Sequence, residues 1–205
     1  MRIVGGSLSG RVLRAPKGAA TRPTSEKVRE AVFNILGASA VDGADVLDLF
    51  AGSGGLGIEA LSRGAAHVTF VDASRQALAV LRDNLAALGL TARATVHAGD
   101  AVAFAARNAT RAVGDAAGDV ATPSPRDGEP ARPWRLVFVD PPYASDLAVR
   151  AVTALPAERL APDATIVIEH DRRHAPPDAL GSLLRTDHRR YGDTLVSFYT
   201  RAVTS

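Results

Sequence analysis

The sequence predicts an α/β protein built on a doubly wound, mostly parallel sheet of seven strands. From residue 44 onward, short apolar segments alternate with helical segments, which is typical of strands buried between two layers of helices. The expected strands cover 45–50, 67–72, 93–97, 135–140, 164–169, 183–191 and 194–199. Only Gly192 and Asp193 separate the last two strands, so we expect an antiparallel hairpin that closes the sheet.

Length and composition fit one folded domain. The chain has 205 residues, of which 46% are hydrophobic and 22% are charged, so it can bury a full core. It has no cysteine, which excludes disulfides, thiolate metal sites and a cysteine nucleophile. There is no apolar run of about 18 residues and no signal-like start, so we expect a soluble, cytoplasmic protein. Residues 113–133 hold four prolines and little to bury, and we expect a flexible loop there.

The N-terminal segment is strongly basic. Residues 1–29 carry a net charge of +6, whereas the rest of the chain sums to −4. We expect residues 1–37 to form a basic extension, a small hairpin followed by a helix that Thr24 caps and Gly37 ends, ahead of a core domain 38–205. This charge balance is typical of a segment that binds a polyanion, although a solvated basic terminus has the same composition. A weaker basic cluster near the C-terminus comprises Arg172, Arg173, Arg185, Arg189 and Arg190.

A glycine-rich turn follows the first expected strand. Within the segment that begins at Asp48, Gly52, Gly54 and Gly57 satisfy the pattern G-x-G-x-x-G between a strand and a helix. Asp72 lies 20 residues after Gly52, at the end of the next strand, where its carboxylate can accept hydrogen bonds from ribose hydroxyls. This pattern alone leaves both NAD and S-adenosylmethionine open as ligands.

Two further carboxylates favour S-adenosylmethionine. Asp48 places a negative charge where a dinucleotide would carry its pyrophosphate, but where a cationic amino acid group would be stabilised. Asp100, after the third strand, can accept a hydrogen bond from an adenine amino group at the same sheet edge. The sequence has no G-x-x-x-x-G-K-S/T phosphate loop, so ATP or GTP hydrolysis is not expected.

The segment Asp140-Pro141-Pro142-Tyr143 ends the fourth expected strand, beside the same edge. The amino group of a base has its lone pair delocalised into the ring, so it must become pyramidal before it can attack a methyl group. The Asp140 side chain and the Pro141 carbonyl can accept its two N–H bonds, while the prolines hold the backbone rigid. Tyr143 offers a ring face on which the base can stack. The segment therefore predicts methylation of an amino group on a nucleic acid base.

Taken in order along the chain, these motifs resemble one family. The Asp-Pro-Pro-Tyr segment and the glycine-rich turn are similar to those of class I S-adenosylmethionine-dependent methyltransferases that act on amino groups of bases. A more specific set of segments resembles the RsmD-type 16S rRNA guanine-N2 methyltransferases over nearly the whole chain. This set comprises Gly5-Gly6, Gly10-Arg11, Thr21–Thr24, Val28–Leu36, Asp48–Arg63 and Tyr191–Thr194. The departure is segment 113–133, which is longer and richer in proline than is usual in the family.

The resemblance implies a Rossmann-like class I methyltransferase fold and a bacterial, cytoplasmic enzyme. It would methylate the N2 amino group of one guanine in 16S rRNA, on the assembled or assembling small subunit, using S-adenosyl-L-methionine, as a monomer without metal or membrane. Cofactor contacts would come from Asp48, Phe50, Ala51, Gly52, Ser53, Gly54, Gly57, Asp72, Ala73, Asp100 and Ala101. The flipped guanine would be held, and catalysis carried, by Asp140, Pro141, Pro142 and Tyr143. RNA phosphates would be contacted by Arg11, Arg14, Arg22 and Arg29.

Other interpretations remain at this point. A DNA or RNA methyltransferase acting on adenine N6 or cytosine N4 would use the same Asp-Pro-Pro-Tyr segment, but sequence-specific enzymes usually carry a recognition domain, and only about 36 residues follow the core here. A cytosine-C5 methyltransferase is excluded because it needs a cysteine. His170 and His174 lack a third ligand in pattern, so a metal site is not expected. Glu169 is expected to be a structural acceptor, and Tyr199 to pack in the hairpin.

Overall fold

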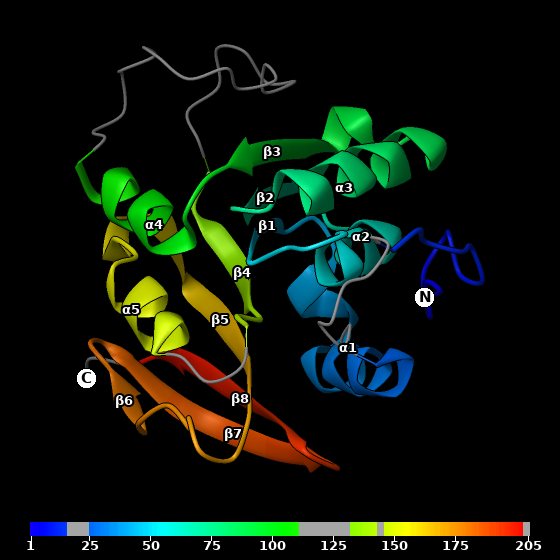
Figure 1. The fold of residues 1–205 in the computed structure, drawn as a ribbon. Helices are drawn as coiled ribbons and strands as arrows, with labels where there is room; N and C mark the ends of the chain where they lie inside the picture. Colours follow the sequence, from blue (N-terminus) through cyan, green and yellow to red (C-terminus); the bar gives the residue numbers. More distant parts are fainter. Residues whose placement is uncertain (16–24, 111–131, 143–145, 203–205) are drawn as a thin grey trace.

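The computed structural model describes residues 1–15, 25–110, 132–142 and 146–202, the side chains of 108–110 excepted. Its helices are α1 (Glu26–Val41), α2 (Gly55–Ser62), α3 (Arg75–Ala87), α4 (Ala101–Thr110) and α5 (Leu147–Thr153), with short 3-10 turns η1 (Thr91–Arg93) and η2 (Ala157–Arg159). Its strands are β1 (Asp45–Leu49), β2 (His67–Asp72), β3 (Ala94–Ala98), β4 (Trp134–Val139), β5 (Leu160–His170), β6 (Ala179–Leu180), β7 (Leu183–Tyr191) and β8 (Thr194–Arg201). Figure 1 shows them around one central sheet.

The sheet has the strand order β3-β2-β1-β4-β5-β8-β7-β6. Strands β1 to β5 pair in parallel, and β8 runs antiparallel to both β5 and β7. It follows that β7 runs in the same direction as β1 to β5. The doubly wound, mostly parallel sheet is confirmed, with eight strands instead of the expected seven. The additional strand, β6, spans only two residues, which is too short to produce a period in the sequence.

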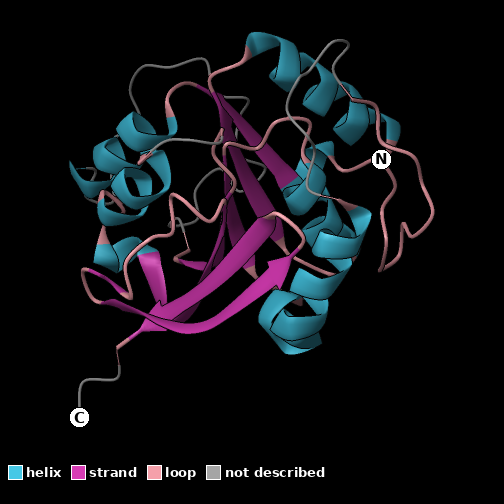
Figure 2. Cartoon of the chain, turned by 60° about the horizontal axis from the view of Figure 1, so that its bottom comes forward, coloured by secondary structure: helices cyan, strands magenta, loops and turns pink. Residues whose placement is uncertain are grey.

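Helices α1, α2 and α3 cover one face of the sheet, and α4 and α5 cover the other (Figures 1 and 2). Successive strand residues contribute to opposite cores, since side chains alternate along a strand. Thus Val46 and Val68 pack under the first three helices, whereas Leu47 and Val71 pack under α4 and α5. Burial on both faces explains why these strands read as continuous apolar runs.

Helix α1 begins at a different cap than expected and has an additional stretch after its expected end. Ser25, not Thr24, is its N-cap, and the Ser25 hydroxyl accepts a hydrogen bond from Val28 N at 3.2 Å. Gly37 has non-helical dihedral angles, with φ of 72°, so it ends the regular helix as expected, but a second helical stretch follows this kink and continues α1 to Val41. The expected boundary at residue 37 therefore falls inside one helix, and the division into 1–37 and 38–205 stays a prediction.

Residues 1–15 form the small hairpin expected from the sequence. Arg2 and Val12 make an antiparallel bridge between its two arms. Ile3 and Leu13 are almost fully buried and join the core under α1, α2 and α3. The hairpin is therefore packed on the molecule and is not a free arm. Most of the loop expected at 113–133 lies outside the described residues.

Candidate active site

The expected site residues meet at one edge of the sheet. The glycine-rich turn follows β1, Asp72 ends β2, Asp100 follows β3, and Asp140 follows β4. These four strands are parallel neighbours, so their carboxyl ends share that edge. The chain order reverses between β1 and β4, which is the point where open α/β sheets bind their ligands.

The glycine-rich turn is strained and held by the neighbouring strand. Phe50 is half-buried and has φ of 62°, the only positive φ of a non-glycine residue in the described ranges. Such a conformation is costly for a bulky side chain and persists only where the surroundings fix it. Here Ala51 N donates to the Val71 carbonyl at 3.0 Å, and Gly52 N donates to Asp72 Oδ2 at 2.8 Å.

The three glycines of the motif have different physical roles. A Cβ at Gly57 would overlap the Phe70 ring and lie 2.9 Å from Asp48 Oδ2, and a Cβ at Gly54 would overlap the Leu81 side chain. Packing therefore favours glycine at both positions, and at Gly54 the positive φ of 89° favours it as well. A Cβ at Gly52 would meet nothing within 4 Å, so this residue borders open space at the sheet edge, where a ligand can approach the backbone.

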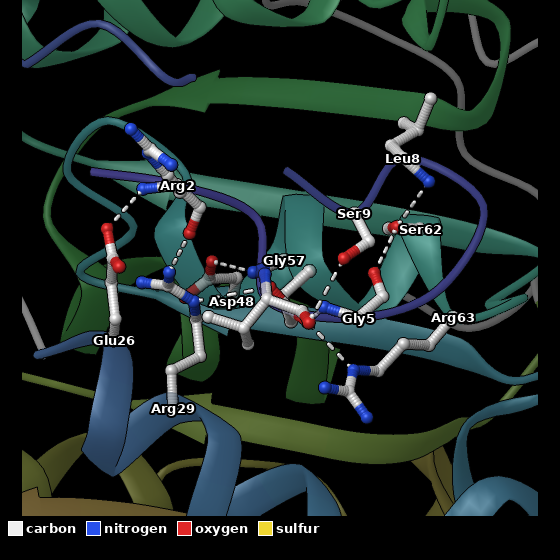
Figure 3. Close-up of polar contacts among 12 residues, drawn as sticks. Arg2, Gly5, Leu8, Ser9, Glu26, Arg29, Asp48, Gly57, Ser62 and Arg63 are labelled. Carbon is white, nitrogen blue, oxygen red and sulfur yellow. Dashed lines mark hydrogen bonds and ion pairs between the residues drawn. The ribbon is translucent and has the colours of Figure 1, made fainter. Parts of the chain in front are cut away.

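Asp48 is a buried carboxyl group inside β1. It is 2% exposed, and its Oδ2 accepts a hydrogen bond from Gly57 N at 2.9 Å (Figure 3). Burial raises its pKa to about 7; the Gly57 N–H opposes this rise, and the charge of Asp72 adds to it. A cationic group nearby would favour the ionised form, whereas a second anion would disfavour it further.

Asp72 and Asp100 are fixed in place by backbone N–H groups. Asp72 accepts from Gly52 N with one oxygen and from Ser74 N, at 2.7 Å, with the other. Asp100 is exposed and accepts from Ala103 N at 2.7 Å at the start of α4. Each carboxylate oxygen has two lone pairs, so both groups retain capacity for a ligand's hydroxyl or amino groups. Of the other expected contacts, Ser53 is half-buried, Ala73 is exposed and Ala101 is buried.

The Asp140 segment leaves β4 beside the end of β1. Asp140 N donates to the Leu49 carbonyl at 3.5 Å, and the Asp140 and Pro141 side chains are half-buried. Pro142 is exposed, and Tyr143 lies outside the described residues. The segment therefore begins beside the last residue of β1, which the glycine-rich turn follows.

The structure gives three different outcomes for the arginines that we expected to contact phosphates. Arg11 and Arg14 are exposed on the N-terminal hairpin, as a phosphate contact requires, and Arg22 lies outside the described residues. The expectation for Arg29 is wrong, because its side chain is fully buried and its Nε lies 3.3 Å from Glu59 Oε2. On α1, residues 28, 29, 32 and 33 form the inward face, so the helical period places this arginine inside.

Glu59 on α2 was not predicted and organises the N-terminal segment. Its buried carboxylate accepts from Val4 N at 2.9 Å, from Gly5 N at 2.8 Å and from Arg63 Nε at 2.8 Å, besides its contact with Arg29. Figure 3 shows the side chains of its two arginine partners, Arg29 and Arg63. The available signal was a single acid in the otherwise apolar helix 55–62.

Asn84 on α3, also missed, joins the hairpin to the glycine-rich turn. Its side chain accepts from Arg14 N at 2.9 Å and donates to the Arg14 carbonyl at 3.1 Å. The same amide nitrogen donates to the Ser53 carbonyl at 3.1 Å. The basic hairpin is therefore held in a defined position relative to the turn. No local sequence pattern distinguishes this asparagine from a surface one.

Comparison with known proteins places these features in one family. The family model described as conserved hypothetical protein 95 matches residues 1–116 and 109–200. Over 178 residues the chain is 36% identical to ribosomal RNA small subunit methyltransferase D of Escherichia coli, with 86% of this chain and 78% of that protein aligned. The chain belongs to the RsmD family.

Two further proteins match the chain along almost its whole length. A Bacillus subtilis protein described as a candidate rRNA methyltransferase, YlbH, is 40% identical over 202 residues, covering 98% of this chain and 99% of its own. The solved structure of a candidate methyltransferase from Escherichia coli, YhhF, has a TM-score of 0.77 at 31% identity, covering 100% of this chain and 99% of that chain. The Rossmann-like methyltransferase fold is thus confirmed, and the relatives' names support rRNA methylation.

The two histidines of β5 and the following loop have separate partners. The buried His170 has its Nε2 2.9 Å from Ser197 Oγ, and burial lowers its pKa. His174 Nδ1 lies 2.9 Å from Asp171 Oδ1. Within the described ranges, no group of three or more acids and histidines could hold a metal ion. In the same ranges, no helix has the length and apolar character needed to cross a membrane.

Proposed function

We propose that this chain transfers a methyl group from S-adenosyl-L-methionine to the N2 amino group of a guanine in bacterial 16S rRNA, on the assembled or assembling small subunit. The observation that carries the proposal is the hydrogen bond between Asp140 N and the Leu49 carbonyl. This bond keeps the segment after β4, which is suited to bind an amino group, next to the glycine-rich turn, which is suited to bind an adenosine ligand. The name of the Escherichia coli relative supports small-subunit rRNA as the substrate.

The residues around the turn fit S-adenosylmethionine better than a dinucleotide. Gly52 borders open space, and Asp72 and Asp100 offer fixed acceptors for ribose and adenine. The pKa of Asp48, raised to about 7, would fall beside a cationic amino acid group, whereas a pyrophosphate would raise it further. Phe50, Ala51, Ser53, Gly54, Gly57, Ala73 and Ala101 would complete the contacts. When bound, the cofactor supplies an electrophilic methyl group on its sulfonium sulfur.

Asp140 would act on the amino group of the target base. Its carboxylate and the Pro141 carbonyl accept the two N–H bonds, which turns the nitrogen lone pair out of the ring plane. The negative charge of Asp140 then stabilises the positive charge that develops on this nitrogen. The proton can leave to solvent afterwards, so no general base is required. Pro142 stiffens the segment, and Tyr143 stacks on the base.

The basic hairpin would position the RNA. Arg11 and Arg14 are exposed, and Asn84 and Glu59 fix the backbone that carries them. Contacts to phosphates of this kind set the register of an RNA on a protein without reading its sequence. Arg22, in the same basic run of the sequence, would add a further contact. We expect the protein to work as a monomer, without a metal ion, in the cytoplasm.

The test uses small subunits purified from cells that lack this protein. They are incubated with the full chain and methyl-labelled S-adenosylmethionine, and the modified nucleoside is identified and mapped by mass spectrometry. N2-methylguanosine at one 16S rRNA position is expected. N6-methyladenosine or N4-methylcytidine would replace the base assignment, and no transfer to subunits or to free RNA would overturn the proposal. By calorimetry, S-adenosylhomocysteine should bind and NAD should not.

A further inference from the structure

A second basic feature lies outside the residues used so far. A cleft of about 380 Å³ opens between the loop that follows β5 and the turn that joins β7 to β8. Its charged lining residues are Asp171, Arg172, Arg173, His174, Arg190 and Asp193. Together they include three arginines of the C-terminal basic cluster, which the proposed function does not use.

The sheet places this cleft at the same edge as the candidate active site. Val139 at the end of β4 pairs with Ile168 of β5, so Asp140 and Asp171 follow the ends of neighbouring strands. Neighbouring strands lie about 4.8 Å apart. The other wall comes from Arg190, at the carboxyl end of β7, the strand beyond β8. The cleft therefore begins one strand away from the catalytic segment.

The three arginines of the cleft carry charge that the described residues do not neutralise. Within the described part of the chain, no carboxylate forms an ion pair with Arg172, Arg173 or Arg190, and all three are exposed. The other two arginines of the basic cluster are paired, Arg185 with Asp178 and Arg189 with Asp187. A surface that needed only solubility would not require unpaired arginines gathered around one hollow.

The acidic residues that line the cleft do not neutralise the positive charge of its three arginines. Asp171 accepts hydrogen bonds from Arg173 N at 2.7 Å, from His174 N at 2.9 Å and from the His174 ring. Its carboxylate therefore shapes the loop. Arg190 Nε donates to the Gly192 carbonyl at 2.9 Å, which fixes the guanidinium beside the turn. Asp193, which is exposed in that turn, carries a negative charge that would repel an anion bound in the cleft.

We propose that this cleft binds backbone phosphates of the RNA strand that carries the target base. The inference rests on the proposed function and adds a second RNA contact to it. The N-terminal hairpin is docked on α2 and α3, which follow β1 and β2, whereas the cleft follows β5 and β7. Asp140, after β4, lies between them in the order of the sheet. Two basic surfaces on either side would hold the nucleotides flanking a base that is flipped into the site. Guanidinium groups suit phosphates because they donate paired hydrogen bonds.

The test measures how salt affects binding to small subunits. We expect the triple variant Arg172→Gln, Arg173→Gln and Arg190→Gln to lower the slope of log affinity against log salt by about 2, since each lost phosphate contact removes about 0.7. A control with the same change of charge replaces Arg82, Arg135 and Arg201, on α3 and at the opposite sheet edge. Its slope should equal that of the wild type. In a separate variant, Asp193→Asn should tighten binding.

The outcomes separate this inference from the proposed function. If the wild type binds and methylates subunits but the cleft variant keeps its salt slope, the cleft is not a phosphate site and the proposed function stands. If the control loses as much slope as the cleft variant, only overall charge matters and the inference is wrong. If the wild type methylates no RNA, the proposed function itself fails. S-adenosylhomocysteine affinity, unchanged in the cleft variant, confirms that the variant is folded.

Discussion

Arg29 of α1 and Glu59 of α2 form an ion pair whose two side chains are both fully excluded from solvent. Arg29 also donates to the carbonyl of Arg2 (Figure 3), while Glu59 accepts from the backbone N–H groups of Val4 and Gly5. The pair thus fastens the first residues of the chain to two helices. One member of the basic run is used to build the N-terminal segment, and the exposed arginines of the hairpin are left for binding.

We expect Arg29→Gln to lower the free energy of unfolding by about 3 kcal/mol, because it leaves a buried carboxylate without its main partner on α1. Urea denaturation measures this change. Arg14→Gln is the matched control: Arg14 pairs with Asp83 at 3.8 Å, and both side chains are largely exposed. The control should change stability by less than about 0.5 kcal/mol. Equal effects of the two substitutions would show that the buried pair adds no more than a surface pair.

Stability should also depend on pH through Asp48. Its pKa is raised from the ordinary value of 3.8 to about 7 in the fold. Between these values the folded chain holds a proton that the unfolded chain has lost, so stability falls as pH rises, by about 1.4 kcal/mol per pH unit from this group. The contribution is complete below pH 3.8 and is lost as pH passes about 7.

The measurement is the difference between wild-type and Asp48→Asn stability across that pH window. The asparagine cannot ionise, so its curve should lack this component and the difference should change with pH. Carboxylates that do not interact with Asp48 contribute equally to both proteins and cancel. Two parallel curves would show that Asp48 titrates normally in the folded state.

The sequence predicted the elements that carry strong local signals. The hairpin around Gly192 and Asp193 is confirmed, with β7 at the expected residues 183–191 and β8 running two residues past its expected end at 199. Thr24 was a poorer prediction because Ser25, equally suited to the role, follows it directly. The helical stretch after Gly37 was missed because a glycine that interrupts a helix can be followed by a second helical stretch across a kink.

The site residues likewise divide into those with a strong local sequence signal and those without one. The positions of Asp72 and Asp140 at one sheet edge were predictable, because both directly mark the carboxyl ends of strands with clear apolar patterns. Arg29, Glu59 and Asn84 were not, since their roles depend on partners 30 to 70 residues away in the chain. The local sequence around an arginine in a basic run is the same whether its side chain faces solvent or a buried acid. Only the period of α1 could have separated the two.

Asp72→Ala should weaken the binding of S-adenosylmethionine by about 2–3 kcal/mol, since a charged acceptor for the ribose is lost. The substitution also releases Gly52 N, so the glycine-rich turn would lose one of its ties. Calorimetry measures the affinity. Asp83→Ala, which removes an exposed carboxylate from α3, is the control and should bind the cofactor as the wild type does. An unchanged affinity in Asp72→Ala would refute the ribose assignment.

The chemistry itself is tested by Asp140→Asn. Asparagine keeps the shape and one acceptor oxygen but removes the negative charge beside the nitrogen that becomes positive. The methyl-transfer rate in single turnover on small subunits should fall by about 100-fold or more. Cofactor and subunit affinity should remain, because the side chain acts on the amino group of the base.

Asp146→Asn is the matched control for this substitution. It makes the same chemical change at a nearby exposed carboxylate that pairs with Arg150 at 3.7 Å, so its methyl-transfer rate should stay at the wild-type value.

Tyr143→Ala should cost about 1–3 kcal/mol of base stacking, and Tyr143→Phe should cost little because the ring face remains. Because the charge of Asp140 and the ring of Tyr143 act on different parts of the base, the first should change the rate and the second the binding. A fully active Asp140→Asn enzyme would mean that charge at this position does not stabilise the transition state.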